Sequence, residues 1–475
     1  MSGLRSRGRL KRTESLGSNR SHESHKNPGN FGRRRGLRRP GAWGVAAAAL
    51  LTALITAACS GTSPVGGGSG GGSPAGRSLN GNATGTVTVW YRSGFAPLFK
   101  QLAKGFNASH KNLKVNVVPV ADADYITKLA TSIRAGTEPD LASLDDVDSE
   151  IFISKNEFLN VTKEVNALSY KDKLSPGALK LATSNGQYYG VPDFADMSVL
   201  WYNKTLFKQA GLNQPPATLP QILTDAQKIK ALGGNDYGFS FAGDCPGCLT
   251  FTLMPNVYAG GDDVLAGQPG HEKATVAGNK SLQATLQLYH ELWADKVVPA
   301  NDQTQNGTTW GKDFQGGHIG MLPGGYGAAA SAPAKMLSQF AIAPLPGPNG
   351  GYSTYDGGAN FGIPAGAKNP AGAWEFVKYA LSLPSQQLTP IGGVEPIRSD
   401  AVTASFKAKY PMVAQIVGYL PHGQAPYTVA HDALFNLVSQ PWQEMFNTAV
   451  YNGNVSGALK QGQSGFTSVL SDLQG

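Results

Sequence analysis

Apolar and polar positions along the chain first suggest two short strands with a helix between them. Residues 86–91 and 115–120 are rich in β-branched and aromatic side chains, which predicts strands. Pro97 opens the segment between them, and its apolar residues recur at helical spacing: Leu98, Phe99, Leu102 and Phe106. The pattern predicts a β-α-β unit, whose parallel strands carry ligand-binding loops at their carboxyl ends.

Similar elements follow downstream. Thr218-Leu219-Pro220-Gln221 has the form of a capping box, and Asn369-Pro370 predicts a second helix start. Apolar residues between 282 and 297 form a further helical face, and short strands are predicted at 198–202 and 359–363. Because strands alternate with helices, the predicted fold class is α/β.

Composition and charge narrow the class of protein. The 475 residues are 41% hydrophobic and 15% charged and include only three Cys, which excludes disulfide-dense miniproteins, coiled coils and polytopic membrane proteins. The net charge is +8, but residues 1–58 hold 12 Lys or Arg and 2 Asp or Glu, so the rest carries +8 − 10 = −2. A nucleic-acid partner is therefore not expected, since that would need a basic folded domain.

The basic residues belong to a leader. An Arg-rich segment ends at Arg39, an uncharged stretch covers 42–58, and Cys59 follows, which predicts an export signal over 1–58. Residues 54–60 resemble a bacterial lipobox, with Thr56 where that pattern prefers Leu, so Cys59 is the predicted lipidation site. A signal anchor and twin-arginine export are alternatives. Residues 59–85, rich in Gly and Ser, would then tether the protein to the membrane as a flexible linker.

Several collinear segments of the remaining chain match one family. The most specific runs from Tyr189-Gly190-Val191-Pro192 through Leu200-Trp201-Tyr202-Asn203-Lys204 to Pro215-Pro216 and Thr218. Tyr258-Ala259-Gly260-Gly261-Asp262 and Gly357–Pro364 follow in the same order. With these segments the chain resembles the extracellular solute-binding proteins of ABC importers, in particular the sugar-binding family that includes maltose-binding protein.

The resemblance implies two α/β lobes that close on one solute. It places residues 86–197 plus 357–416 in an N-terminal lobe and 198–356 plus 417–475 in a C-terminal lobe, with crossings near 196–202, 356–360 and 415–419. The implied partners are a saccharide and the permease subunits with their ATPase, at the outer face of the cell membrane. The chain is expected to be a monomer and not an enzyme, and no cluster of residues predicts a cofactor or a metal.

A cleft for a neutral sugar needs paired donors and acceptors and flat aromatic rings. Trp90, Tyr91, Arg92 and Ser93 lie where the family's first strand opens into the cleft, and Asp145 and Asp146 follow the matched Pro139-Asp140. Trp90 has a core position as its alternative, with Tyr91 then on the opposite face of the strand. Asp146 has a helix cap as its alternative.

Family position implies further candidates: Asp196, Phe251, Tyr326, Glu395 and Trp442. Asp196 matches an inter-lobe region, with a solvated hinge carboxylate as the alternative. Phe251 and Trp442 have core positions as alternatives, and Glu395 has a surface charge. Tyr326 stands where many members of the family have Trp, which leaves stacking there in question.

Cys245-Pro246-Gly247-Cys248 is the sharpest local motif. A CxxC sequence can be a redox dithiol, half of a zinc site or a structural disulfide, and outside the cytoplasm a disulfide is the favoured interpretation. Two rival functions stay open at this point. One is a secreted glycoside hydrolase, which needs two suitably spaced carboxylates. The other is a binder of a polyamine, an amino acid or a glycerol phosphodiester.

Overall fold

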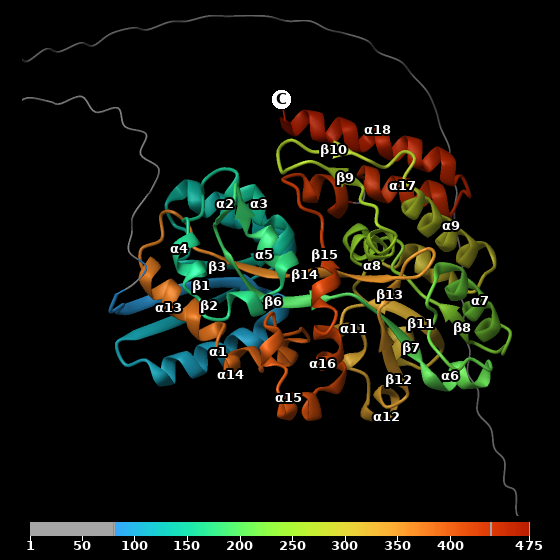
Figure 1. Cartoon of the computed structure of the whole chain (residues 1–475), viewed down its shortest axis with the longest axis horizontal. Helices are drawn as coiled ribbons and strands as arrows, with labels where there is room; N and C mark the ends of the chain where they lie inside the picture. Colours follow the sequence, from blue (N-terminus) through green and yellow to red (C-terminus); the bar gives the residue numbers. More distant parts are fainter. Residues whose placement is uncertain (1–78, 80, 438, 475) are drawn as a thin grey trace, which may run out of the picture. The chain divides into compact units, whose positions relative to one another are not determined.

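The computed structural model describes residues 79, 81–437 and 439–474, and Figure 1 shows its elements. The predictions about the export signal and Cys59 lie outside these residues. The described chain forms two larger mixed sheets and two two-stranded sheets, with helices around them, which confirms the α/β class. Within the described ranges, no helix combines the length and apolarity needed to cross a bilayer.

The first sheet is built around the predicted β-α-β unit. Strand β1 (Gly85–Arg92) pairs in parallel with β2 (Leu113–Val120) and β3 (Leu141–Asp145). Strand β14 (Tyr352–Gly362) runs antiparallel to β3 and to β6 (Val191–Met197). Short strands β13 (Leu345–Pro346) and β15 (Gly423–Gln424) also pair with β14. We call this sheet and its helices the first lobe.

The helices of the first lobe include the crossover between β1 and β2. They are α1 (Ala96–Ser109), α2 (Tyr125–Ala135), α3 (Ser149–Ile153), α4 (Thr162–Asn166), α5 (Pro176–Leu181), α13 (Pro370–Ala380) and α14 (Leu383–Gln386). A two-stranded ribbon, β4 (Thr183–Ser184) with β5 (Gln187–Tyr188), follows α5.

The strands of the second sheet lie in the sequence between β6 and β13, which both belong to the first sheet. Strand β7 (Val199–Asn203) runs antiparallel between β11 (Ile319–Gly324) and β12 (Phe340–Ala343), and β8 (Tyr237–Phe239) pairs in parallel with β11. We call this sheet and its helices the second lobe. Its helices are α6 (Lys204–Gln209), α7 (Leu219–Lys230), α8 (Pro246–Ala259), α9 (Lys280–Ala294), α10 (Lys312–Gln315), α11 (Gly327–Ala330), α12 (Ala334–Leu337), α17 (Pro441–Val450) and α18 (Val455–Gln474).

Side-chain caps explain where several helices begin. The Thr218 hydroxyl accepts a hydrogen bond from the amide of Gln221 at 3.4 Å, which confirms the predicted start of α7. Asn369 accepts from the amide of Gly372 at 3.1 Å, ahead of the proline that opens α13. Both caps are therefore interactions between residues three apart in the sequence, and Asn369 is held in addition by hydrogen bonds to Asp140 and Thr84.

Two of the predicted crossing segments coincide with the passage between the sheets. Strand β6 of the first sheet ends at Met197, and β7 of the second begins at Val199. Strand β14 then returns, with Asp356 opposite Met197. The third segment begins in α16 (Pro411–Val417), where the Gln415 side chain donates to the carbonyl oxygen of Ile342 in β12 at 3.3 Å. The lobe boundaries themselves stay a prediction.

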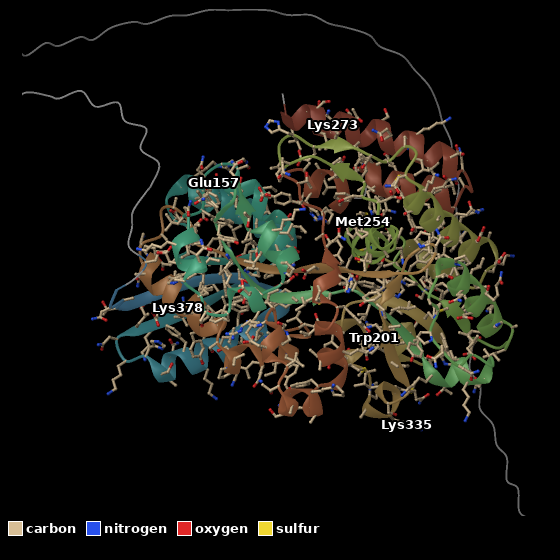
Figure 2. The ribbon with its side chains drawn as sticks, viewed as in Figure 1. Glu157, Trp201, Met254, Lys273, Lys335 and Lys378 are labelled. Atoms are coloured by element: carbon tan, nitrogen blue, oxygen red, sulfur yellow. A yellow bond between two sulfur atoms is a disulfide. The ribbon has the colours of Figure 1, made fainter. Side chains whose placement is uncertain are left out.

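The core follows the buried faces of the two sheets. Tyr91 stacks on Phe99, with ring centroids 4.5 Å apart, beneath the first sheet. Of the residues labelled in Figure 2, Trp201 and Met254 are fully buried, whereas Lys273, Lys335 and Lys378 are exposed. Leu79, within the predicted linker, is also buried against the first core.

Candidate functional site

Two adjoining pockets lie between the carboxyl ends of β1 and β3 and the amino end of α8. Their volumes are about 160 Å³ and about 470 Å³. Both are lined by Arg92 and Asp196 from the first lobe and by Gly247 and Phe251 from the second. We therefore treat them as one site and call it the inter-lobe pocket.

An ion pair occupies the first-lobe wall of the inter-lobe pocket. Arg92 ends β1 and Asp145 ends the neighbouring parallel strand β3, so their side chains meet at the same sheet edge. The Arg92 guanidinium lies 2.5 Å from the Asp145 carboxylate and donates to the carbonyl oxygen of Gly358 at 2.6 Å. This fixes the guanidinium between β3 and the crossing strand β14.

Carboxylates outnumber cations around this pair. Burial opposes the positive charge of Arg92, but Asp145 and other nearby carboxylates outweigh burial and raise the pKa of the guanidinium. Burial raises the pKa of Asp196 to about 6, and the Asp145 charge adds to the rise while Arg92 opposes it. Asp146 is 1% exposed, and neither of its carboxylate oxygens has a hydrogen-bond partner. Burial, followed by Asp145, raises the Asp146 pKa well above its usual value.

Aromatic rings supply the apolar surface of the inter-lobe pocket. Phe95 lies under the Arg92 guanidinium, 4.9 Å from carbon to ring centroid. Phe251 of α8 packs edge-on against Trp310, with centroids 6.4 Å apart, and tilted against Tyr355 at 5.3 Å. Phe95, Phe251 and Trp310 are half-buried, so each keeps part of its ring exposed. The pocket thus combines ring surface with charged and hydroxyl groups.

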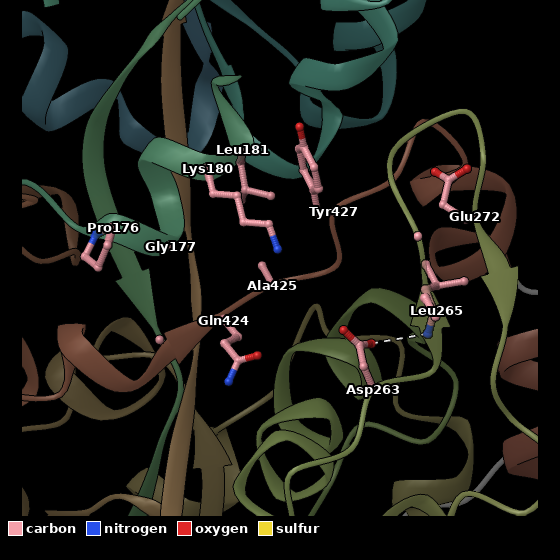
Figure 3. Close-up of a pocket in the computed structure, with 13 residues that line it drawn as sticks. Pro176, Gly177, Lys180, Leu181, Asp263, Leu265, Glu272, Gln424, Ala425 and Tyr427 are labelled. Carbon is pink, nitrogen blue, oxygen red and sulfur yellow. Dashed lines mark hydrogen bonds between the residues drawn. The ribbon is translucent and has the colours of Figure 1, made fainter. Parts of the chain in front are cut away.

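A separate pocket of about 290 Å³ lies between α5 and the loop that follows α8. Figure 3 shows Lys180 and Tyr427 on one side of it and Asp263 on the other. Its polar groups interact within the protein: Lys180 lies 5.0 Å from the Tyr427 ring centroid, and Asp263 accepts from the amides of Val264 and Leu265. Among the described residues that line this pocket, Tyr427 is the only aromatic one, so the pocket offers less stacking surface than the inter-lobe pocket.

Four predicted site residues come together in the inter-lobe pocket: Arg92, Asp145, Asp196 and Phe251. The first aromatic pair lies elsewhere. Trp90 packs on the α2 face of the sheet, with the Lys128 ammonium 5.1 Å from its ring centroid, and Tyr91 is fully buried on the opposite face. Strand alternation accounts for both orientations, since Arg92 and Trp90 share one face and Tyr91 the other.

The other candidates also lie away from the pocket surface. Ser93 is exposed outside it, Asp146 is buried behind Asp145, and Tyr326 stacks against Trp201 at 6.3 Å. Glu395 is 0% exposed and accepts from the amide of Met197 at 3.1 Å. Trp442 is 1% exposed in the second-lobe core. None of these side chains is among those that line the inter-lobe pocket in the described chain.

Cys245 and Cys248 form a disulfide at the amino end of α8. Cys245 is the N-cap residue, and its sulfur accepts from the amide of Cys248 at 3.3 Å. The bridged turn holds Gly247 and Cys248 against the inter-lobe pocket. The motif therefore supports the pocket wall.

Sequence reasoning missed several residues of this region. Phe95, Trp310 and Tyr355 line the pocket, and their local sequences carry no motif. His431 and Asn436 also line it, although their segment returns from far along the chain. Of these residues, Phe95 could most easily have been predicted from the sequence, because it lies three residues after Arg92, at the end of β1.

Comparison with known proteins identifies related chains. The profile of the family described as bacterial extracellular solute-binding protein matches residues 93–387. A binding protein of Brucella abortus is 25% identical over 383 residues, which cover 75% of this chain and 86% of that protein. The diacetylchitobiose binding protein DasA of Streptomyces coelicolor is 26% identical over 323 residues, 64% of this chain and 71% of that one.

Two further likenesses concern a relative in sequence and a solved structure. The sn-glycerol-3-phosphate-binding periplasmic protein UgpB of Brucella abortus is 28% identical over 293 residues, 57% of this chain and 63% of that protein. The structure of the sugar-binding protein MalE from Xanthomonas citri superposes with a TM-score of 0.72 at 19% identity, covering 82% of this chain and 98% of that chain. This likeness supports the two-lobed fold.

Proposed function

Since the chain belongs to the bacterial extracellular solute-binding protein family, we propose that it is the solute-binding component of an ABC importer and holds a sugar or small oligosaccharide in the inter-lobe pocket. The observation that carries the proposal is the composition of this pocket. Exposed ring surface of Phe95, Phe251 and Trp310 lies beside the polar groups of Arg92, Asp145 and Asp196. Sugar C–H faces pack on such rings, and sugar hydroxyls pair with such polar groups.

Charge argues for a neutral solute over an anionic one. The Arg92 guanidinium is already paired with Asp145 at 2.5 Å, and Asp196 lies in the same pocket. A phosphate group would meet these carboxylates without a free cation among the residues that line the inter-lobe pocket. The likeness to a glycerol-3-phosphate-binding protein is therefore outweighed here by the charges of the pocket. A polyamine, being cationic, is the alternative that the charges allow.

The wider setting completes the proposal. The chain would be exported and held at the outer face of the membrane by a lipid on Cys59, with residues 59–85 as tether. The lobes, 86–197 with 357–416 and 198–356 with 417–475, would close on the solute as a monomer and present it unchanged to the permease subunits. A glycoside hydrolase would instead release product with time.

A binding panel tests the function. The chain is mixed with maltose, maltotriose, diacetylchitobiose, mannobiose, glycerol 3-phosphate and spermidine, and melting temperature and calorimetric affinity are measured. We expect at least one saccharide to raise the melting temperature in a concentration-dependent way and to be recovered unchanged. Stabilisation by glycerol 3-phosphate or spermidine alone would contradict the proposed sugar class, and appearance of a cleaved sugar would contradict the binding role.

One variant tests whether the saccharide binds in the inter-lobe pocket. Phe251→Ala removes exposed ring surface, so the affinity for the stabilising saccharide should fall roughly tenfold, about 1.4 kcal/mol. Lys335→Ala, at an exposed position that lines neither pocket, is the matched control and should bind as the unaltered chain does. Equal affinity of Phe251→Ala and the unaltered chain would remove this ring from the site.

A further inference from the structure

Three potential metal ligands meet beside the inter-lobe pocket. Asp148 ends η3 (Asp146–Asp148), directly after β3 of the first lobe. His431 and Asp432 stand at the start of the π-helix η9 (Asp432–Asn436), which packs against α8 and α17 of the second lobe. One ligand atom of each residue lies within 4.8 Å of the other two. The cluster thus joins two parts of the chain that belong to different lobes.

The pair at the centre of this cluster is too far apart for a hydrogen bond. His431 Nδ1 lies 3.6 Å from Asp148 Oδ1, beyond the usual hydrogen-bond range. Two ligands on a tetrahedral Zn²⁺, each about 2.1 Å from the metal, would stand about 3.4 Å apart. The observed separation is therefore close to that of two ligands that share one metal ion.

Burial gives an independent reason to expect a cation. Asp148 is 6% exposed and His431 is 3% exposed. The Oδ1 atom of Asp148 makes no hydrogen bond and faces the His431 imidazole at 3.6 Å, a contact that is an ion pair only when the imidazole is protonated. A buried carboxylate oxygen without a hydrogen bond is costly, and a divalent cation would satisfy it. The nearby charges of Asp145 and Asp432 add negative potential at the same point.

The surrounding residues suit the outer shell of a metal site. Asn436 donates to Asp432 Oδ1 at 2.6 Å, which orients that carboxylate. On the far side of the imidazole, Nε2 of His431 faces the Tyr355 hydroxyl at 3.5 Å, so a proton on Nε2 would leave the Nδ1 lone pair for a metal. The Asn436 amide nitrogen lies 3.5 Å from Nδ1, so a metal ion there would displace this contact. Asp432 is half-exposed, and a rotation of its side chain can close the remaining gap.

We propose that Asp148, His431 and Asp432 bind a divalent transition-metal ion, with Zn²⁺ as the preferred species, and that this ion links the two lobes. One imidazole and two carboxylates suit Zn²⁺ better than Ca²⁺, which takes six or more oxygen ligands. Because Asp148 belongs to one lobe and the other two ligands to the other lobe, the bound ion favours the arrangement in which the lobes meet. His431 also lines the inter-lobe pocket, but none of the three ligands is one of its exposed rings, and metal binding can be measured without any solute.

Metal titration of the full chain, prepared without a histidine tag and stripped with a chelator, tests the proposal. Zn²⁺ alone is titrated by calorimetry, and Co²⁺ is used as a spectroscopic substitute. We expect one tight ion per chain, a visible tetrahedral Co²⁺ band, and a melting temperature that rises with Zn²⁺. Absence of tight Zn²⁺ binding would mean that Asp148 and His431 form an ion pair only.

Variants of the proposed ligands test whether the metal ion binds at this cluster. His431→Ala should abolish tight binding and the Co²⁺ band, and Asp432→Asn should weaken binding at least about tenfold. His318→Ala, which removes an exposed His–Asp pair at 3.0 Å in the second lobe, is the matched control and should bind normally. Unchanged affinity in both His431→Ala and Asp432→Asn would overturn the assignment. If circular dichroism shows that His431→Ala is unfolded, the half-exposed Asp432→Asn decides.

Discussion

At the scale of single residues, buried carboxylates are the feature with the clearest physical consequence. Asp302 in the second lobe is 2% exposed and forms no ion pair within the described chain. It accepts hydrogen bonds from the amide of Phe241 at 3.0 Å and the hydroxyl of Ser240 at 3.2 Å. Burial nevertheless raises the pKa of Asp302 to about 8. The folded protein therefore holds a proton here that the unfolded chain releases near pH 4.

This sets the sign of a pH dependence. Stability from the protonated Asp302 is fully present below the unfolded pKa and is lost as pH rises toward about 8. The upper limit from one such group is about 1.4 kcal/mol per pH unit. Asp302→Asn, which cannot ionise, should lose less stability than the unaltered chain between pH 5 and 8, as measured by urea unfolding.

Asp400 provides the opposite case as a control. Hydrogen bonds from Arg398, at 2.9 Å and 2.6 Å, lower the Asp400 pKa. Its contribution is present above the unfolded pKa and is lost as pH falls through the lower folded pKa. Asp400→Asn should therefore destabilise the protein at neutral pH and leave the slope between pH 5 and 8 unchanged. Parallel curves for Asp302→Asn and the unaltered chain would argue against the protonated Asp302.

The sequence predicted the position of a site residue best where that residue follows a predicted strand. Arg92 was predicted from the end of a predicted strand, and Asp145 from its position after the matched Pro139-Asp140. The structure shows that both residues end parallel strands of one mixed sheet. Trp90 and Tyr91 could not be excluded, because the alternation of the strand does not say which face a helix covers. Here α2 covers one face and α1 the other. His431 could not be foreseen, since its neighbours come from a distant strand.

At the scale of elements, β14 is the strand that the sequence described least well. A strand was predicted at 359–363, whereas β14 spans Tyr352–Gly362. The segment Asp356-Gly357-Gly358 has no alternating apolar pattern, so its pairing with β6 and β15 depends on tertiary contacts. The helix starts at Thr218 and Asn369 were predictable because a cap is a local interaction.

Gly358 allows β14 to pass close to β6. Its φ is 147°, a conformation that favours glycine, and a Cβ there would collide with the carbonyl oxygen of Phe194. Its own carbonyl oxygen accepts from Arg92 at 2.6 Å. Gly358→Ala should therefore destabilise the protein by about 2 kcal/mol or more and lower solute affinity, as measured by urea unfolding and calorimetry.

Gly94→Ala is the matched control for this prediction. A Cβ at Gly94 would meet only the Asp122 carboxylate, at an ordinary contact distance of 3.8 Å. Its effect on stability should stay within about 0.5 kcal/mol. Equal unfolding midpoints for the two variants would show that β14 can shift away from β6 without cost.

At the scale of the whole molecule, the family pattern predicted more than local patterns could. Collinear segments such as Tyr189–Pro192 and Gly357–Pro364 identified a two-lobed fold that periodicity alone leaves undetermined. The family pattern could not show which residues face the pocket, because no matched motif contains Phe95 or Trp310. Packing between the lobes, and not any one segment, determines that surface.

Closure of the lobes can be tested at a glycine contact on the rim of the pocket. Gly327 in α11 of the second lobe faces Gly393, which follows the first-lobe helix η6 (Thr389–Gly392). A Cβ at Gly327 would lie 3.4 Å from the Gly393 carbonyl oxygen, and both residues line the inter-lobe pocket. A large side chain here would hold the lobes apart without altering either core, since Gly327 is exposed.

Gly327→Trp should therefore reduce the affinity for the stabilising saccharide at least about tenfold, because part of the binding free energy must now displace the indole. In X-ray scattering, saccharide should decrease the radius of gyration of the unaltered chain and of the exposed control Lys335→Trp, and decrease that of Gly327→Trp less. If Gly327→Trp compacts as fully as the control, the solute is held without closure at this rim. If no chain compacts although the saccharide binds, the two lobes do not move on binding, and affinity arises from a pocket that is already formed.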